Sequence, residues 1–168
     1  MELIKERSMV KYIFSSLLNF GIGYVAGLLL AILITAAIGA GGMMSFFVIP
    51  NAVGNACGLV AWNLYQTWFF YTMAQDVNAA CIGDGLETDS FMHVAVLDVV
   101  TFGIYRIYWL YKLANRMRVN APNYGFKMVE TGKDIAVMSI FSFGYVSAWE
   151  LIKNMNRIAY VYNNGSAA

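Results

Sequence analysis

Residues 95–103, with the sequence AVLDVVTFG, decide the architecture of this chain, because the stretch returns 41 residues later as AVMSIFSFG at 136–144. The register then continues without a gap to Arg116 and Arg157, and the 22 aligned columns contain eight identities. An internal repeat of this kind indicates one supersecondary unit used twice, with the two copies packed together. The repeat predicts an architecture and not a reaction.

The composition predicts an integral membrane protein. The chain has 168 residues, the length of one domain, and only 12% of them are charged, against roughly 25% in soluble domains. From Tyr12 to Gln75 there are 64 consecutive residues without Asp, Glu, Lys, Arg or His. A membrane span needs roughly 20 apolar residues, so this run holds two helices and their connection. The net charge of +1 and the lack of a basic run give no indication of a nucleic-acid partner.

The amino-terminal half divides into three segments. Residues 1–11 form a short charged lead that we expect on the cytoplasmic side, before an uncleaved anchor. Residues 12–75 form a two-helix transmembrane hairpin, with helices over about 12–38 and 51–74. The glycines at 39–42 end the first helix, and Pro50 suits the first turn of the second. Residues 76–90 form a solvated acidic loop.

Small residues recur every fourth position in the first helix. They form a flat stripe that lets another backbone approach closely. The partner of this stripe is either the second helix, which has a small pair of its own, or another copy of the chain. The predicted helix-packing residues are Gly23, Gly27, Ala31, Thr35, Gly39, Gly54 and Gly58.

The repeats are too short to be ordinary spans. The first unit covers residues 91–118 and the second 132–163, with a basic loop at 119–131 between them and a tail at 164–168. Their uncharged runs are shorter than the roughly 18–20 residues of a span, which favours re-entrant or interfacial segments. We therefore predict an all-α membrane protein in which two transmembrane helices precede two short helical hairpins, with turns at 101–103 and 142–144. The alternative is four spans.

The charge pattern favours the two-span arrangement. Short basic loops stay in the cytoplasm, so two spans place the basic loop and both termini inside. Four spans would place the basic loop outside.

Asp98 and Arg106 lie at similar distances on either side of the first turn. A hairpin would bring them together as an intramembrane pair, and a pair shares the cost of burying charge in lipid. In the second copy both positions are serine, Ser139 and Ser147. The alternative is an interfacial Asp and a separate Arg that extends to the membrane surface.

Two further groups of polar residues are candidates for binding. A Lys, an Asn and an Arg share one helix face in each copy and could hold anionic lipid headgroups, although a solvated face would have the same pattern. These candidates are Lys112, Asn115, Arg116, Lys153, Asn156 and Arg157. The amides Asn55, Asn63 and Gln66 could line a polar path in the bilayer or form interhelical hydrogen bonds.

The sequence offers no arrangement typical of an enzyme. His93 is the only histidine, and Cys57 and Cys81 form neither a disulfide framework nor a metal site. No glycine-rich phosphate loop follows a strand. We therefore expect no catalytic residues, no metal and no cofactor.

The string TFGIYRIYWLYK at 101–112 resembles a bacterial family of small membrane proteins, domain of unknown function 4234. The resemblance covers about residues 91–163. It departs at Arg106, where a small residue is commoner, and in the long uncharged amino-terminal half. The resemblance implies a membrane location and this architecture, and it implies no activity.

Two hypotheses of function follow. The first is a structural or accessory subunit of a homo-oligomeric or larger assembly in the inner, cytoplasmic membrane. Its partners would be membrane lipids and other membrane subunits. The second is an oligomeric pore or small transporter, with a path lined by the amides of the second helix and by the Asp98–Arg106 pair.

Overall fold

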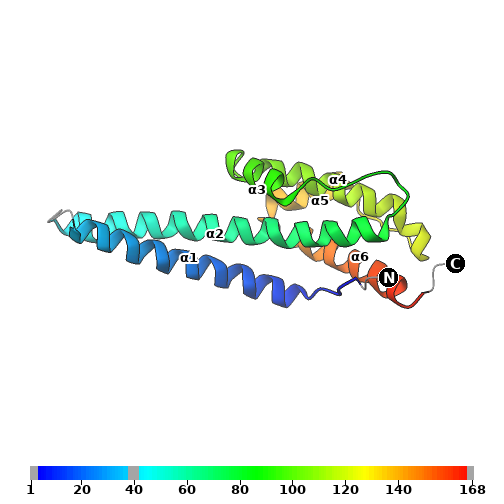
Figure 1. The fold of residues 1–168 in the computed structure, drawn as a ribbon, viewed down its shortest axis with the longest axis horizontal. Helices are drawn as coiled ribbons and strands as arrows, with labels where there is room; N and C mark the ends of the chain where they lie inside the picture. The colour runs from blue at the N-terminus through cyan, green and yellow to red at the C-terminus, as the bar shows by residue number, and fades with distance from the viewer. Residues whose placement is uncertain (1–3, 38–41, 166–168) are drawn as a thin grey trace. The chain divides into compact units, whose positions relative to one another are not determined.

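The computed structural model describes residues 4–37 and 42–165, and all regular structure in these ranges is helical (Figure 1). The helices in order are α1 (Met9–Ala37), α2 (Met43–Ala80), α3 (Phe91–Val100), α4 (Ile104–Asn120), the short 3-10 helix η1 (Ala121–Tyr124), α5 (Gly132–Phe141) and α6 (Tyr145–Asn163). They belong to two compact units. The two-helix unit is Ile13–Gln66, and the core unit is Met1–Tyr12 with Thr67–Ala168.

In the two-helix unit, α1 and α2 run antiparallel and in close contact. A Cβ added at Gly23 would lie 2.7 Å from the Cβ of Ala61, and one added at Gly27 would lie 2.7 Å from the Cβ of Cys57. As the residue number rises on α1 it falls on α2, which sets the antiparallel direction. Only residues without a side chain permit this approach, and close backbone contact is how helices associate in lipid.

Among the described residues, α1 and α2 are the two helices that are long and apolar enough to cross a membrane. Few of their apolar side chains are buried within the chain. Leu29, Leu33 and Leu59, for example, are exposed. A helix in the core of a soluble protein would bury such residues, so their exposure favours a membrane location.

The second long helix differs from its predicted bounds at both ends. It begins at Met43 and not near Asn51, so Pro50 lies inside the helix and not in its first turn. It ends at Ala80, so Asp76 is helical and the acidic loop is shorter than predicted. The first difference arises because Met43–Ile49 form one more helical stretch before the proline. At the second end, Asp76 is accommodated within the helix and forms an ion pair with Arg7, described below.

The carboxyl-terminal half contains two helix–turn–helix segments, α3–α4 and α5–α6. The helices break at 101–103 and at 142–144, the positions predicted for the turns. Phe102 and Phe143 have positive φ angles of 52° and 51°. A phenylalanine in this left-handed conformation is strained by about 1–2 kcal/mol, so the surrounding hydrogen bonds must hold it.

Those hydrogen bonds are the same at both turns. The hydroxyl of Thr101 donates to the carbonyl of Leu97 at 2.6 Å and accepts from the N–H of Tyr105 at 2.9 Å. The hydroxyl of Ser142 donates to Met138 at 2.5 Å and accepts from Val146 at 3.0 Å. Each hydroxyl therefore provides an acceptor for one N–H that the break in the helix leaves free, and its own proton goes to a carbonyl that already accepts a backbone N–H.

Contacts with α2 show that the turns of both segments lie at the same end of the core unit. Near one end of this stretch of α2, Thr67 bonds to Asp98, just before the first turn. The ring of Phe69 lies 4.5 Å from that of Tyr12, which lies 5.9 Å from Tyr145, just after the second turn. Both turns therefore lie at the Thr67 end.

The other end of this stretch of α2 contacts the end of α4. Asn78 accepts a hydrogen bond from Arg116, and the carbonyl of Ala80 accepts one from Tyr124. Thr67 and Ala80 lie about 20 Å apart at 1.5 Å per residue. The core between them is built from regularly spaced apolar residues of α2, α4 and α6, among them Phe70, Met73, Val77, Leu110, Leu113, Met117, Leu151, Met155 and Ile158.

Candidate functional site

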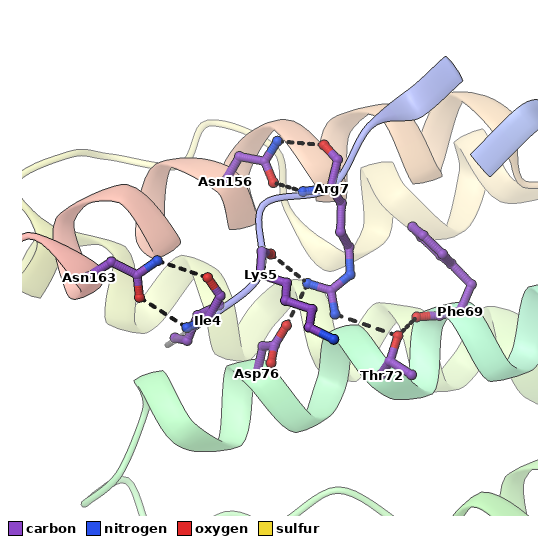
Figure 2. A network of polar contacts seen from close by, with 8 residues as sticks. All are labelled: Ile4, Lys5, Arg7, Phe69, Thr72, Asp76, Asn156 and Asn163. Atoms are coloured by element: carbon purple, nitrogen blue, oxygen red, sulfur yellow. Dashed lines mark hydrogen bonds and ion pairs between the residues drawn. The ribbon is translucent and has the colours of Figure 1, made fainter. Parts of the chain in front are cut away.

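Two asparagines of α6 bind the backbone of the N-terminal segment, which we define as residues 4–8. Asn156 accepts a hydrogen bond from the N–H of Arg7 and donates one to its carbonyl, both at 2.8 Å. Asn163 does the same for Ile4, at 3.0 and 2.8 Å (Figure 2). Because the two asparagines are seven residues apart, they share one face of α6. They hold a segment that has no regular hydrogen bonding of its own.

The side chain of Arg7 crosses from this segment to α2. Its guanidinium forms an ion pair of 2.6 Å with Asp76 and a hydrogen bond of 3.5 Å with Thr72 (Figure 2). It also lies over the ring of Phe69, 6.0 Å from the centroid. Asp76 is the first charge after the long uncharged run, so Arg7 meets α2 where its character changes from apolar to charged.

A cavity of about 470 Å³ lies beside this ion pair, between the N-terminal segment, α2 and the start of α3. This volume falls within the range of small-molecule sites. Both basic and aromatic side chains line it. The lining residues are Ile4, Lys5, Arg7, Trp68, Tyr71, Thr72, Gln75, Asp76, Ala79 and Phe91.

The structure brings Asp98 and Arg106 together next to the first turn. Their side chains are only 2% and 12% exposed, and the closest nitrogen and oxygen are 3.6 Å apart. Thr67 of α2 donates a hydrogen bond of 2.6 Å to the same carboxylate oxygen of Asp98. Three elements thus contribute to one buried polar cluster, α2 through Thr67, α3 through Asp98 and α4 through Arg106.

Arg116, predicted to contact lipid headgroups, is engaged within the chain. Its guanidinium binds both oxygens of Asp84, at 2.7 and 2.9 Å, and also donates to Asn78. The hydrogen bonds from Arg116 hold the pKa of Asp84 below its usual range. Cys81 lies next to this cluster, and its burial raises the pKa of its thiol to about 11, so this cysteine is not a reactive thiolate. The cluster ties the end of α2 and the following loop to α4.

The other five headgroup candidates lie in different surroundings. Lys153 is ion-paired with Glu130 at 3.4 Å and with Glu150. Asn115 accepts from the N–H of Gly132 at 2.9 Å, and Asn156 binds Arg7. Lys112 lies over the ring of Tyr108 and Arg157 over that of Phe126. Four of the six candidates are thus joined to other parts of the chain by hydrogen bonds or ion pairs.

The residues predicted for helix packing and for a polar path also have defined places. Gly54 and Gly58 lie against Tyr24 and Phe20 of α1. Ala31 and Thr35 are buried, and Gly39 lies outside the described residues. Among the path residues, Asn55 is exposed and donates to the carbonyl of Asn51 at 2.9 Å, Asn63 is half-buried, and Gln66 is buried.

No group of three His, Cys, Asp or Glu side chains within 4–37 and 42–165 could hold a metal ion. The ring of His93 lies 6.1 Å from that of Tyr105.

Sequence reasoning missed the Arg7 site. The signal was weak: one arginine in a short charged lead, and one acidic residue at the end of a long uncharged run. Their partnership spans 69 positions of sequence, from 7 to 76, and follows only from the fold. The repeated spacing of Asn156 and Asn163 could have indicated a shared helix face, but not the segment that this face binds.

A comparison of sequences places the chain in a family. It matches the family described as Domain of unknown function (DUF4234) over residues 56–119 and again over residues 89–159. The chain belongs to this family. In this DUF4234 protein the matched residues run from the middle of α2 into α6 and include the buried Asp98 cluster and the Asp84–Arg116 pair. No curated protein and no solved structure matches the chain. The description of DUF4234 assigns no activity.

Proposed function

We propose that this protein is a non-enzymatic integral membrane protein, a structural or accessory subunit of a homo-oligomeric or larger assembly. It lies in a bacterial inner membrane with both termini in the cytoplasm. The long apolar helices α1 and α2 are the transmembrane anchor, and the basic loop at 119–131 lies on the cytoplasmic side. The described part of the small-residue stripe on α1 faces α2, so association with other subunits uses other surfaces.

One observation carries this proposal: both helix–turn–helix segments have an exposed phenylalanine in the turn, and both turns lie at the Thr67 end of α2. Phe102 is 95% exposed and Phe143 is 75% exposed. Neighbouring apolar residues of the same segments, such as Val100 and Phe141, are exposed as well. Apolar side chains gathered in this way favour burial in another medium. The lipid of the inner leaflet would be this medium if the two segments enter it as re-entrant hairpins.

Two further observations support a duplicated hairpin. The hydroxyl hydrogen bonds at 101 and 142 are equivalent, and so are the left-handed phenylalanines that follow them. The two family matches begin 33 positions apart, at 56 and 89, and end 40 positions apart, at 119 and 159, so one family pattern fits the chain twice at an offset comparable to the repeat of 41. A duplicated unit suits a scaffold, because both copies can present the same apolar turn to one membrane surface.

Cysteine accessibility tests the membrane topology. With Cys57 and Cys81 replaced, single cysteines are placed at Asn123 and Gly165, and intact cells are treated with an impermeant maleimide. We expect neither site to react until the cells are opened. Reaction of Asn123→Cys from outside, without Gly165→Cys, would show that the repeats span the membrane and would overturn the hairpin proposal.

A second pair of single cysteines tests the turns themselves. In opened cells, Phe102→Cys and Phe143→Cys should react slowly because lipid shields them. Val129→Cys is the matched control, since Val129 is 77% exposed and lies away from the turns, in the loop before α5. Equal reaction rates at all three positions would place the turns in water.

A double substitution separates the subunit from the pore. Asn55→Leu with Asn63→Leu removes two amides from α2, and both assembly and ion flux are then measured. Lost assembly supports the accessory subunit, because these amides then serve helix packing. Unchanged assembly with lost flux would instead establish the pore.

A further inference from the structure

We propose that the cavity beside Arg7 binds the phosphate group of an anionic phospholipid. The site is built by Lys5 and Arg7 of the N-terminal segment, by Trp68, Tyr71 and Asp76 of α2, and by Phe91 at the start of α3. The inference rests on the membrane location proposed above, and it adds a ligand class and a site that the function itself does not require.

Among the described residues that line the cavity, two are basic, Lys5 and Arg7, and one is acidic, Asp76. Arg7 is paired with Asp76 at 2.6 Å. Lys5 has no hydrogen-bond or ion-pair partner for its ammonium group within the described part of the chain. Figure 2 shows both side chains extending from the N-terminal segment toward α2. Two cations beside one carboxylate attract an anion, and a phosphate can accept hydrogen bonds from both.

The backbone of the N-terminal segment holds these cations in place before any ligand arrives. Asn156 and Asn163 make four hydrogen bonds to Arg7 and Ile4, which flank Lys5 in sequence. A site whose backbone is already fixed loses less conformational entropy on binding. The asparagines therefore act as positioning residues for the cations.

The aromatic residues indicate that the ligand is an amphiphile. Trp68 is 51% exposed, and the rings of Tyr71 and Phe91 lie 5.5 Å apart. Trp and Tyr side chains concentrate at the level of lipid headgroups. Along α2 the cavity runs from Trp68, near the apolar turns, to Asp76 and Ala79, near the charged end. A phosphate near Lys5 and Arg7 would leave acyl chains to pass along Trp68 toward the apolar end.

Binding to the purified full-length protein tests this site. In neutral detergent, thermal unfolding and native mass spectrometry are measured with added phosphatidylglycerol or phosphatidylcholine at equal mole fraction. We expect phosphatidylglycerol to raise the Tm and remain bound, and phosphatidylcholine to do neither. Equal effects of the two lipids would overturn the proposal.

Paired variants locate the binding. Lys5→Gln should weaken phosphatidylglycerol binding about fivefold, the size expected for one basic residue at an anionic membrane surface. Lys11→Gln is the matched control, because Lys11 belongs to the same basic lead, is exposed and does not line the cavity. Equal losses for the two variants would show a general attraction of the lead and would refute a site at Lys5.

Soluble ligands distinguish the source of the phosphate. Inorganic phosphate and glycerol 3-phosphate are added in place of lipid, and we expect neither to change the Tm at millimolar concentration. An equal Tm rise with glycerol 3-phosphate, lost in Lys5→Gln, would mean that the site takes a soluble phosphate and would overturn the lipid assignment.

Membrane fractionation keeps this inference separate from the proposed function. Protein that fractionates with membranes but shows no preference for phosphatidylglycerol would refute the lipid site alone. Protein in the soluble fraction would refute the membrane subunit and the lipid site together.

Discussion

Breaking the buried Asp98–Arg106 pair should destabilise the core unit strongly. In Arg106→Leu the carboxylate of Asp98 stays buried, and removing one partner of a buried pair costs about 3–5 kcal/mol. Two features of the structure reduce this figure. The pair is rather long at 3.6 Å, and the hydroxyl of Thr67 still donates to Asp98. We therefore expect a loss of about 2–3 kcal/mol in the free energy of unfolding, close to the cost of one charge in a membrane helix.

The second copy of the repeat provides the matched control. Its residues at the equivalent positions are Ser139 and Ser147. The double variant Asp98→Ser with Arg106→Ser removes both charges and leaves none buried without its partner. It should lose less stability than Arg106→Leu does, and its free energy of unfolding should be within about 1 kcal/mol of the unmodified protein.

Unfolding in mixed micelles measures the coupling. The unmodified protein, Asp98→Ser, Arg106→Ser and the double variant form a cycle, titrated with a denaturing detergent and followed by circular dichroism. We expect a coupling energy of about 1–2 kcal/mol, because residues in contact are not additive. A coupling below about 0.5 kcal/mol, the level of independent sites, would refute the reasoning.

Three further predictions test other parts of the structure. Gly23→Ala should cost about 1–3 kcal/mol of stability by overpacking against Ala61 and the Cys57 carbonyl, whereas Gly21→Ala, with open space around its Cβ, should be neutral in thermal unfolding. Because the pKa of Asp84 is lower in the folded than in the unfolded chain, its ionised carboxylate stabilises the folded state. This contribution is fully present above about pH 4 and is lost as the pH falls through the pKa that Asp84 has in the folded protein. Asp84→Asn should therefore lower the Tm at pH 7, and the gap should close on acidification. Asn163→Ala should speed hydrogen exchange at the amide of Ile4, and Asn164→Ala, which loses only a bond to its own helix, should not.

The sequence predicted the helical elements because their signals are local. A run of 64 residues without charge specifies α1 and α2, whatever the rest of the chain does. The Phe-Gly pairs at 102–103 and 143–144 mark the two breaks because glycine takes the left-handed conformation readily and a hydroxyl precedes each pair. Insertion of these turns into a leaflet stays a prediction.

The sequence did not predict which polar groups would meet across the fold. Arg116 was a candidate for lipid because basic residues near aromatics are typical of membrane surfaces, yet its partner Asp84 lies 32 positions earlier. Asp76 was assigned to a loop because it is the first charge after an apolar run. It lies within α2 and pairs with Arg7, 69 positions earlier. Such pairings depend on how the helices pack, which periodicity alone does not specify.

The two turns share a backbone geometry but are held to the rest of the core unit in different ways. At the second turn, Ser139 and Ser147 donate to carbonyls of their own segment, at 2.8 and 2.9 Å, and so their hydroxyls need no partner from another element. The aromatic ring of Tyr12 packs against this turn at Tyr145. At the first turn, Asp98 takes its hydrogen bond from Thr67 of α2.

Where the turns enter lipid, as proposed above, this difference has a physical consequence. Apolar surfaces gain little there by packing against each other, because the lipid chains are equally apolar, whereas hydrogen bonds between elements keep their direction. The first turn is therefore held to α2 by the hydrogen bond from Thr67 to Asp98. The second segment is held by the hydrogen bond from the N–H of Gly132 to Asn115 of α4 and by the N-terminal segment that Asn156 and Asn163 bind. A ligand at Lys5 and Arg7 would therefore contact the first segment through Phe91 and act on the second through the N-terminal segment.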